Sequence, residues 1–171
     1  QLGDGGLVTT NNKELYSRIK SLAQYGWDEN RDARLNGINS RLDELQAAIL
    51  KVKLKYLDQD NNERREIANI YKSKIINPLI SHPKEADYSY HVYHLYVVKI
   101  KGDREKLIKF LQGNQIFLGI HYSLPVHSQE FYKKFVKNAD LKATNSLSKN
   151  IVSLPIYQGM EIGHVNKIIN I

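Results

Sequence analysis

The hydrophobic and polar positions of this chain change their period along the sequence, and each change predicts a new element. Residues 7–10 form a short apolar and β-branched run that predicts a strand, followed by the polar pair 11–12. Leu15, Ile19 and Leu22 then recur at spacings of three and four, which predicts an amphipathic helix. Because the edges of a strand need hydrogen-bonding partners, the run at 7–10 indicates that other strands of its sheet precede it.

The longest periodic stretch covers residues 41–76, where the chain contains neither Gly nor Pro. Apolar residues recur there with a helical period, which predicts one long helix or two nearly collinear helices that meet near residues 58–62. Pro78 ends the helical pattern. At the other end Ser40 is the expected N-cap, with Asp43 three residues later in the capping-box position. A helix of this length in a short chain usually links domains or packs against a partner subunit.

The second half of the chain alternates extended and helical patterns. The predicted strands lie at residues 91–100, 116–122 and 153–156. The predicted helices lie at residues 104–113 and 161–171. In the first of these strands His91 and His94 would lie on opposite faces, with His94 packed and hydrogen-bonded. In the first helix Leu107, Phe110 and Leu111 would point inward. A few strands with several helices make a small α+β layer structure.

The amino-acid composition excludes only a few classes of binding partner. The net charge of +7 would suit an anionic partner such as a nucleic acid or a nucleotide-linked substrate, but the Lys and Arg residues are dispersed like those of a solvated surface. No RNA-binding strand signature or apolar run of membrane-spanning length occurs, so we expect neither a nucleic-acid nor a membrane partner. The absence of Cys excludes disulfides and is compatible with a reducing cytoplasm.

Candidate chemistry is concentrated at two places. Asn39 and Arg41 flank the predicted helix start, where unpaired N–H groups favour a phosphate or carboxylate, although a well-capped helix needs no ligand. His121 and His127 bracket a loop that follows a predicted strand, and loops at strand ends often carry functional groups. A metal site lacks a third ligand at usable spacing, and Walker, GxGxxG and GxSxG motifs are absent.

Four motifs, in this order, resemble the DegT/DnrJ/EryC1/StrS family of sugar aminotransferases. They are residues 3–10 (Gly-Asp-Gly-Gly and the strand after it), Tyr25–Gly26, residues 37–48, and His121–Tyr122 with Pro125 and His127, followed by residues 153–157. The resemblance covers the whole chain, and the third motif is highly specific. It implies an α/β fold, the C-terminal part of a type I aminotransferase that holds pyridoxal 5′-phosphate. Residues 1–40 would close the large domain, residues 41–78 form the connecting helix, and residues 79–171 form the small α+β domain.

The same resemblance implies a function and a set of site residues. The reaction would move an amino group from an amino acid to a nucleotide-linked keto-sugar, for amino-sugar or surface-polysaccharide biosynthesis, in a cytoplasmic homodimer. Asn39 matches the Asn that meets the cofactor phosphate of the neighbouring subunit, and Arg41 lies beside it. The positions implied for the substrate cleft are Tyr25, His121, Tyr122 and His127.

The lysine that forms the Schiff base lies, by this resemblance, just before Gln1. No catalytic residue is therefore expected among these 171 residues, and the chain alone is expected to be inactive. Gln115 departs from the family pattern, which usually has Gly there. The alternative is a non-catalytic interaction domain that dimerises through the long helix or binds an anion. The coding sequence before residue 1 would distinguish the two.

Overall fold

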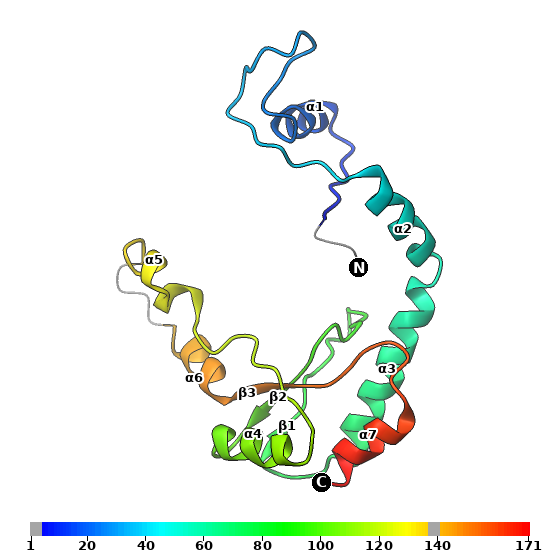
Figure 1. Ribbon diagram of the computed structural model, residues 1–171. Coiled ribbons are helices and arrows are strands. Elements are labelled where there is room, and N and C mark those ends of the chain that lie inside the picture. Colours follow the sequence, from blue (N-terminus) through cyan, green and yellow to red (C-terminus); the bar gives the residue numbers. More distant parts are fainter. Residues whose placement is uncertain (1–4, 137–140) are drawn as a thin grey trace. The chain divides into compact units, whose positions relative to one another are not determined.

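The computed structural model describes residues 5–136 and 141–171 and has two compact units, Gln1–Leu57 and Asp58–Ile171 (Figure 1). Gly3 and Asp4, the first two residues of the first motif, lie outside the described residues. Helices and short strands alternate along the chain, which confirms a mixed α/β architecture.

The first unit begins with an irregular segment and a capped helix. Helix α1, Lys13–Leu22, forms where the apolar period predicts it, and the side chain of Asn12 accepts a hydrogen bond from the Leu15 amide at 3.0 Å. Residues 5–10 adopt no regular structure, and Leu7 is 89% exposed. The strand predicted at 7–10 is therefore wrong for the described chain, because no described segment pairs with it.

Helix α2, Glu44–Leu54, starts later than its sequence predicts. Its N-cap is Asp43, whose amide donates to Gln46 Oε1 at 3.3 Å in a capping box. Ser40 is not the cap, because residues 41–43 are not helical, and its amide donates to the carbonyl of Ala23 at 3.0 Å. The break after α2 falls at residues 55–56, where amides bond three residues back and tighten the last turn, rather than at 58–62.

The second unit is built on helix α3, Leu57–Lys74, and a three-stranded antiparallel sheet. The strands are β1 (Ile80–Ser81), β2 (Tyr96–Ile100) and β3 (Ile151–Leu154), in the order β1-β2-β3. The register places Val98 opposite Val152, and both are fully buried. Tyr71 of α3 is also fully buried, and its hydroxyl donates to the carbonyl of Pro155 at 2.8 Å. The core therefore joins α3 to the sheet.

The remaining helices of the second unit are α4 (Arg104–Gly113), a 3-10 turn at Val126–Ser128, α5 (Glu130–Lys133), α6 (Lys142–Asn150) and α7 (Ile162–Ile169). Helix α4 spans the predicted residues, because Asp103 caps it and accepts from the Lys106 amide at 2.9 Å. Leu111 is buried as expected, but Phe110 is 54% exposed, so its inward placement is wrong. The sequence pattern predicts no element at α6.

Two predicted strands are much shorter than expected. Of residues 91–100 only 96–100 form β2, because Tyr93 has a φ of 46°, which strands do not adopt. His94 is exposed rather than packed. The strand predicted at 116–122 reduces to a single bridge between Gly119 and Ser153.

Candidate functional site

Two close-packed turns shape the first unit around Tyr25 and Gly26. Gly26 has a φ of +74°, and a Cβ there would lie 1.8 Å from the carbonyl oxygen of Leu35. A Cβ on Gly37 would lie 2.1 Å from the Gly26 nitrogen. The Tyr25 amide donates to Ile38 O at 3.0 Å. Only glycine allows this close approach of the two segments, which explains why the Tyr25–Gly26 and Gly37 motifs belong together.

The approach of these segments brings three predicted site residues into contact. Gln24 and Asn39 form an antiparallel bridge, so Tyr25 lies close to Arg41. Arg41 Nε donates to Asn39 Oδ1 at 2.8 Å, and its guanidinium lies 5.9 Å from the centre of the Tyr25 ring. The Asn39 oxygen is thus occupied. The Asn39 amide hydrogens and the outer nitrogens of Arg41 have no hydrogen-bond partner among the described residues.

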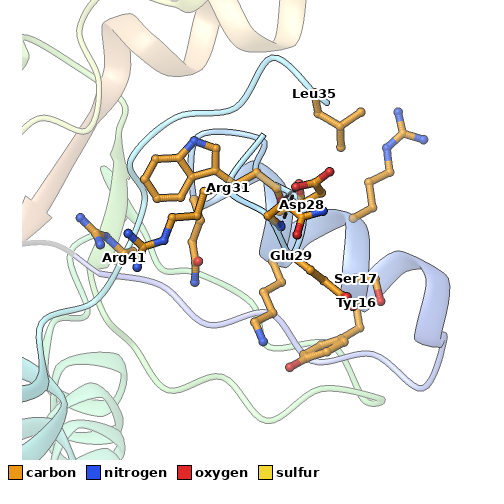
Figure 2. A pocket seen from close by; sticks show the side chains of 13 residues that line it. Tyr16, Ser17, Asp28, Glu29, Arg31, Leu35 and Arg41 are labelled. Carbon is orange, nitrogen blue, oxygen red and sulfur yellow. Dashed lines mark hydrogen bonds between the residues drawn. The ribbon is translucent and has the colours of Figure 1, made fainter. Parts of the chain in front are cut away.

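A hollow of about 970 Å³ opens beside this cluster in the first unit. Figure 2 shows the side chains around it, which are those of Tyr16, Ser17, Arg18, Lys20, Ser21, Gln24, Trp27, Asp28, Glu29, Asn30, Arg31, Leu35 and Arg41. The Arg31 guanidinium lies 5.9 Å from the Trp27 ring, and the Tyr25 and Trp27 ring centres are 4.8 Å apart. The hollow therefore combines an aromatic wall with several cations. The sequence patterns do not single out Arg31 or Trp27.

The acidic residue Asp28 is part of the loop that forms this hollow. Its Oδ1 accepts hydrogen bonds from the amides of Asp32 and Asn30, at 3.0 and 2.9 Å, and its Oδ2 pairs with Arg34 Nε at 3.2 Å. The backbone bond from Asp32, and then the bond from Arg34, lower the pKa of Asp28. Asp28 thus stays ionised and organises the loop.

A second hollow of about 760 Å³ also includes Arg41 in its lining. Asn39 and Ser40 line it together with the glycines at 5 and 6. Tyr16, Lys20 and Arg41 line both hollows. Arg41 therefore belongs to the walls of two spaces that both present cationic and hydrogen-bonding groups.

The other predicted site residues belong to the second unit. His121 Nδ1 lies 2.9 Å from Ser153 Oγ, and the His121 ring meets the Tyr122 ring edge-on with centres 5.4 Å apart. Tyr122 itself is 73% exposed. His127 Nε2 lies 2.9 Å from Asn145 Oδ1 of α6. Each histidine thus has one ring nitrogen held by its own side-chain partner.

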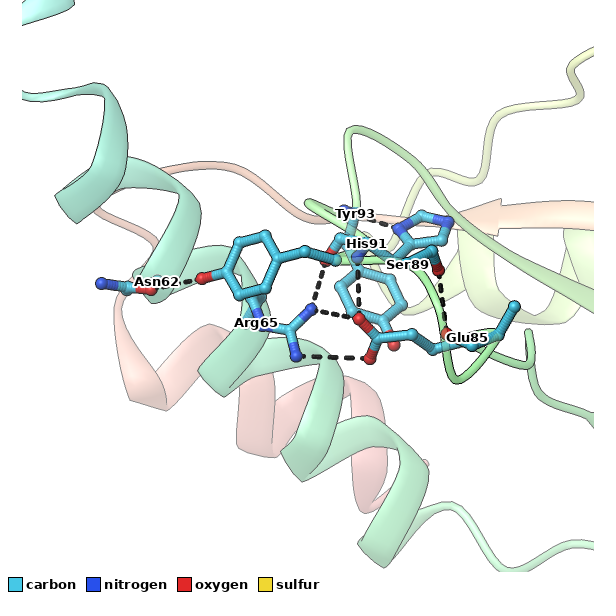
Figure 3. Close-up of polar contacts among 8 residues, drawn as sticks. Asn62, Arg65, Glu85, Ser89, His91 and Tyr93 are labelled. Carbon is cyan, nitrogen blue, oxygen red and sulfur yellow. Dashed lines mark hydrogen bonds and ion pairs between the residues drawn. The ribbon is translucent and has the colours of Figure 1, made fainter.

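The second unit also contains a polar network that the sequence patterns do not reveal (Figure 3). Arg65 Nη1 donates to Glu85 Oε1 at 2.6 Å and to the His91 carbonyl at 2.7 Å, while the His91 amide donates to Glu85 Oε1 at 2.7 Å. The Arg65 guanidinium also lies 4.1 Å from the Tyr90 ring centre. The bond from Arg65 lowers the pKa of Glu85. This network fastens the loop before β2 to α3 and is structural.

Neither a metal-ligand cluster nor a membrane-spanning helix is found in the part of the chain that the structure describes. No group of three or more His, Cys, Asp or Glu residues there could hold a metal ion. Within residues 5–136 and 141–171, no helix is long and apolar enough to cross a membrane.

Fold comparison defines the class of protein. The chain superposes on S. venezuelae DesV with a TM-score of 0.87 and 32% identity, covering 94% of this chain and 44% of that chain. A Brucella abortus DegT DnrJ EryC1 StrS aminotransferase gives 0.87 and 31%, over 94% and 43%. The fold is therefore that found in part of an aminotransferase, which confirms the type I assignment.

The family follows from the sequence. The model of the DegT/DnrJ/EryC1/StrS aminotransferase family matches residues 1–171, so the chain belongs to that family. A relative from Aneurinibacillus thermoaerophilus, dTDP-3-amino-3,6-dideoxy-alpha-D-galactopyranose transaminase, is 42% identical over 165 residues, 96% of this chain and 45% of that protein. The chain spans about half the length of the relatives it matches.

Proposed function

We propose that this chain is part of a pyridoxal 5′-phosphate-dependent aminotransferase that moves an amino group from an amino acid to a nucleotide-linked keto-sugar. Relatives with this activity in their names act on dTDP-linked and UDP-linked sugars. The observation that carries the proposal is that Arg41 lines two hollows, both of which contain cations and hydrogen-bond donors. Such a pair of spaces suits two anionic ligands, a cofactor phosphate and a substrate diphosphate.

The second hollow fits the cofactor phosphate. Aminotransferases of this family depend on pyridoxal 5′-phosphate, which when bound supplies the electron sink for transamination. Asn39 would donate to the phosphate through its side-chain NH2 group, while its oxygen accepts from Arg41 Nε, and Arg41 would donate through its outer nitrogens. The helix dipole is not the source of this affinity, since α2 begins at Glu44, five residues after Asn39. The proposed phosphate contacts therefore come from side-chain donors and not from a helix terminus.

The first hollow fits the nucleotide diphosphate of the substrate. Arg31, Arg41 and Lys20 supply positive charge, and Trp27 offers an aromatic face for a nucleobase. Tyr25 packs on Trp27 and beneath Arg41, so its role is to position these groups. His121, Tyr122 and His127, which belong to the second unit, are proposed separately to contact a sugar-nucleotide substrate.

The Schiff-base lysine is proposed to come from outside these 171 residues. Lys20 lines both hollows, so it is the described lysine best placed to react with the cofactor aldehyde. Borohydride trapping with pyridoxal 5′-phosphate, followed by peptide mapping, should give scattered substoichiometric labelling and no transaminase turnover. One stoichiometric adduct at Lys20 together with turnover would refute this part of the proposal.

Homodimerisation is proposed through α2. None of its residues is buried, and Leu45 and Val52, which share one helix face at a spacing of seven residues, are 72% and 57% exposed. Covering such side chains stabilises an interface by about 25 cal/mol per Å² of apolar surface. Sedimentation velocity should show a dimer that the L45E/V52E double variant reduces to a monomer. Identical sedimentation of the two proteins would exclude α2 as the interface.

The proposed substrate site is tested with the only tryptophan of the chain, Trp27, as reporter. Titration with dTDP should quench its fluorescence, because Trp27 lines the first hollow. Arg31→Ala should weaken binding by roughly tenfold, the loss of one charge-assisted hydrogen bond. Lys13→Ala, which removes the same charge outside both hollows, is the matched control. Equal affinity for inorganic pyrophosphate would favour the alternative, a general anion-binding domain, and no quenching by dTDP would refute the site.

A further inference from the structure

His121 is held by a residue that the function proposed above does not mention, the buried Ser153. Ser153 is 5% exposed, and its Oγ lies 2.9 Å from His121 Nδ1. Its backbone is fixed as well, since the Ser153 amide donates to Gly119 O at 2.8 Å and the Gly119 amide donates to Ser153 O at 3.2 Å. The Ser153 hydroxyl is therefore attached to a backbone position that is held in place within β3.

The direction of this hydrogen bond follows from the burial of the hydroxyl. If Nδ1 carried the proton it would donate to Oγ, and the hydroxyl hydrogen would have no acceptor among the described residues. An unsatisfied buried donor is costly. The hydroxyl therefore donates to Nδ1, and the neutral ring carries its proton on Nε2.

Gly119 allows the ring to lie where this bond can form. A Cβ added to Gly119 would lie 2.6 Å from His121 Cε1 and 3.3 Å from Nδ1. Real Cβ atoms do not approach ring atoms so closely, so any larger residue would displace the imidazole. Gly119 and Ser153 thus fix the position and the tautomer of the ring together.

We infer that Ser153 is a positioning residue that locks His121 as the Nε2–H tautomer, so that the imidazole offers a donor to an acceptor oxygen of the ligand. This deepens the proposed function and rests on it for the identity of the ligand. His121 Nε2 has no partner among the described residues, whereas His127 uses its Nε2 on Asn145 Oδ1. The two histidines therefore present opposite groups, a donor from His121 and an acceptor from His127. The acceptor oxygen for His121 comes either from a phosphate or from a sugar hydroxyl.

The tautomer is measured directly by long-range ¹H–¹⁵N spectra of the imidazoles in the 171-residue chain, at a pH where histidine is neutral. His82 is an internal reference, since its Nε2 lies 2.8 Å from the Ile75 carbonyl, which can only accept. In the native chain His121 should match His82, with a protonated Nε2. An Nδ1–H pattern for His121 would overturn the inference without any variant.

Variants then separate positioning from simple packing. Ser153→Ala should convert His121 to a mixture of tautomers while His82 stays unchanged, and Ser153→Thr should restore the single form. Gly119→Ala should also mix the tautomers although the hydroxyl remains, and Gly163→Ala is its control, because a Cβ there meets nothing within 4 Å. A single Nε2–H form in Ser153→Ala would show that Ser153 does not set the tautomer.

Ligand titrations identify the oxygen and test the proposed function separately. Inorganic pyrophosphate, glucose and dTDP-glucose are added in turn while the His121 Nε2–H signal is followed. A shift with pyrophosphate assigns the donor to a phosphate, and a shift with glucose assigns it to a hydroxyl. Ser153→Ala should lower the affinity for whichever of these ligands shifts the signal by roughly 3- to 10-fold. If no probe shifts the signal, the substrate role of His121 fails, whereas the tautomer result stands or falls on the spectra alone.

Discussion

Replacing Tyr71 with Phe should destabilise the second unit at neutral pH and stabilise it, relative to the native protein, at strongly alkaline pH. The Tyr71 ring is fully buried, and its hydroxyl donates to Pro155 O at 2.8 Å. Removing the hydroxyl loses that bond and leaves the carbonyl unpaired, which together cost about 1–2 kcal/mol. The core itself is unchanged, because Phe fills the same volume apart from the lost oxygen.

At alkaline pH the stability difference between the native protein and the Tyr71→Phe variant should reverse. Burial, and then the neighbouring Tyr157 and Tyr96, raise the pKa of Tyr71 above its ordinary value of 10.0. The unfolded chain therefore loses the tyrosine proton above about pH 10 while the folded chain keeps it, so native stability falls by about 1.4 kcal/mol per pH unit. Phe has no such proton to lose. The lower stability of the variant should thus disappear at roughly pH 11, one unit above the pH at which the unfolded chain begins to lose the tyrosine proton.

Urea unfolding followed by circular dichroism measures both effects. Tyr88→Phe is the control, because Tyr88 is 95% exposed and should show no difference at either pH. An unchanged gap between the Tyr71→Phe and native proteins at neutral and alkaline pH would refute the argument from burial. A variant as stable as the native protein at neutral pH would refute the role of the hydrogen bond.

Three further outcomes are expected. Glu85→Gln should speed amide hydrogen exchange at His91, whose N–H donates to Glu85 Oε1 at 2.7 Å, and unchanged exchange would count against the network. Gly26→Ala should weaken dTDP quenching of tryptophan fluorescence at least tenfold, because its φ of +74° and its backbone contact exclude a Cβ. Asp43→Ala should lower stability by about 1 kcal/mol as the N-cap of α2, while Ser40→Ala should leave helix content unchanged, and the reverse order in urea unfolding would restore Ser40 as the cap.

The helices are the elements that the sequence predicts best. The signals for α1 and α4 are local, a capping side chain followed by an apolar period of three and four residues. Where two caps compete, local signals do not decide. Ser40 and Asp43 are both good N-caps, and the helix begins at Glu44, after Asp43, where the capping box with Gln46 forms.

The strands show the limit of local reasoning. Residues 7–10 and 116–122 have strand-like composition, yet the first pairs with nothing described and the second makes one bridge. Residues 91–95 lie outside β2, where a bond from Tyr93 N to His91 Nδ1 at 2.9 Å and the contacts of Arg65 hold an irregular loop. A strand exists only where a second segment supplies its hydrogen bonds.

By itself, the sequence determined the family, the positions of α1 and α4 and the identity of polar residues such as Asn39 and Arg41. Only the tertiary structure decided which of them meet, as Arg41 does with Asn39 and His121 with Ser153. It also added Arg31 and Trp27, which no local motif marks. The physical reason is range: caps and periods act within a few residues, whereas strand pairing and side-chain contacts join segments far apart in the chain.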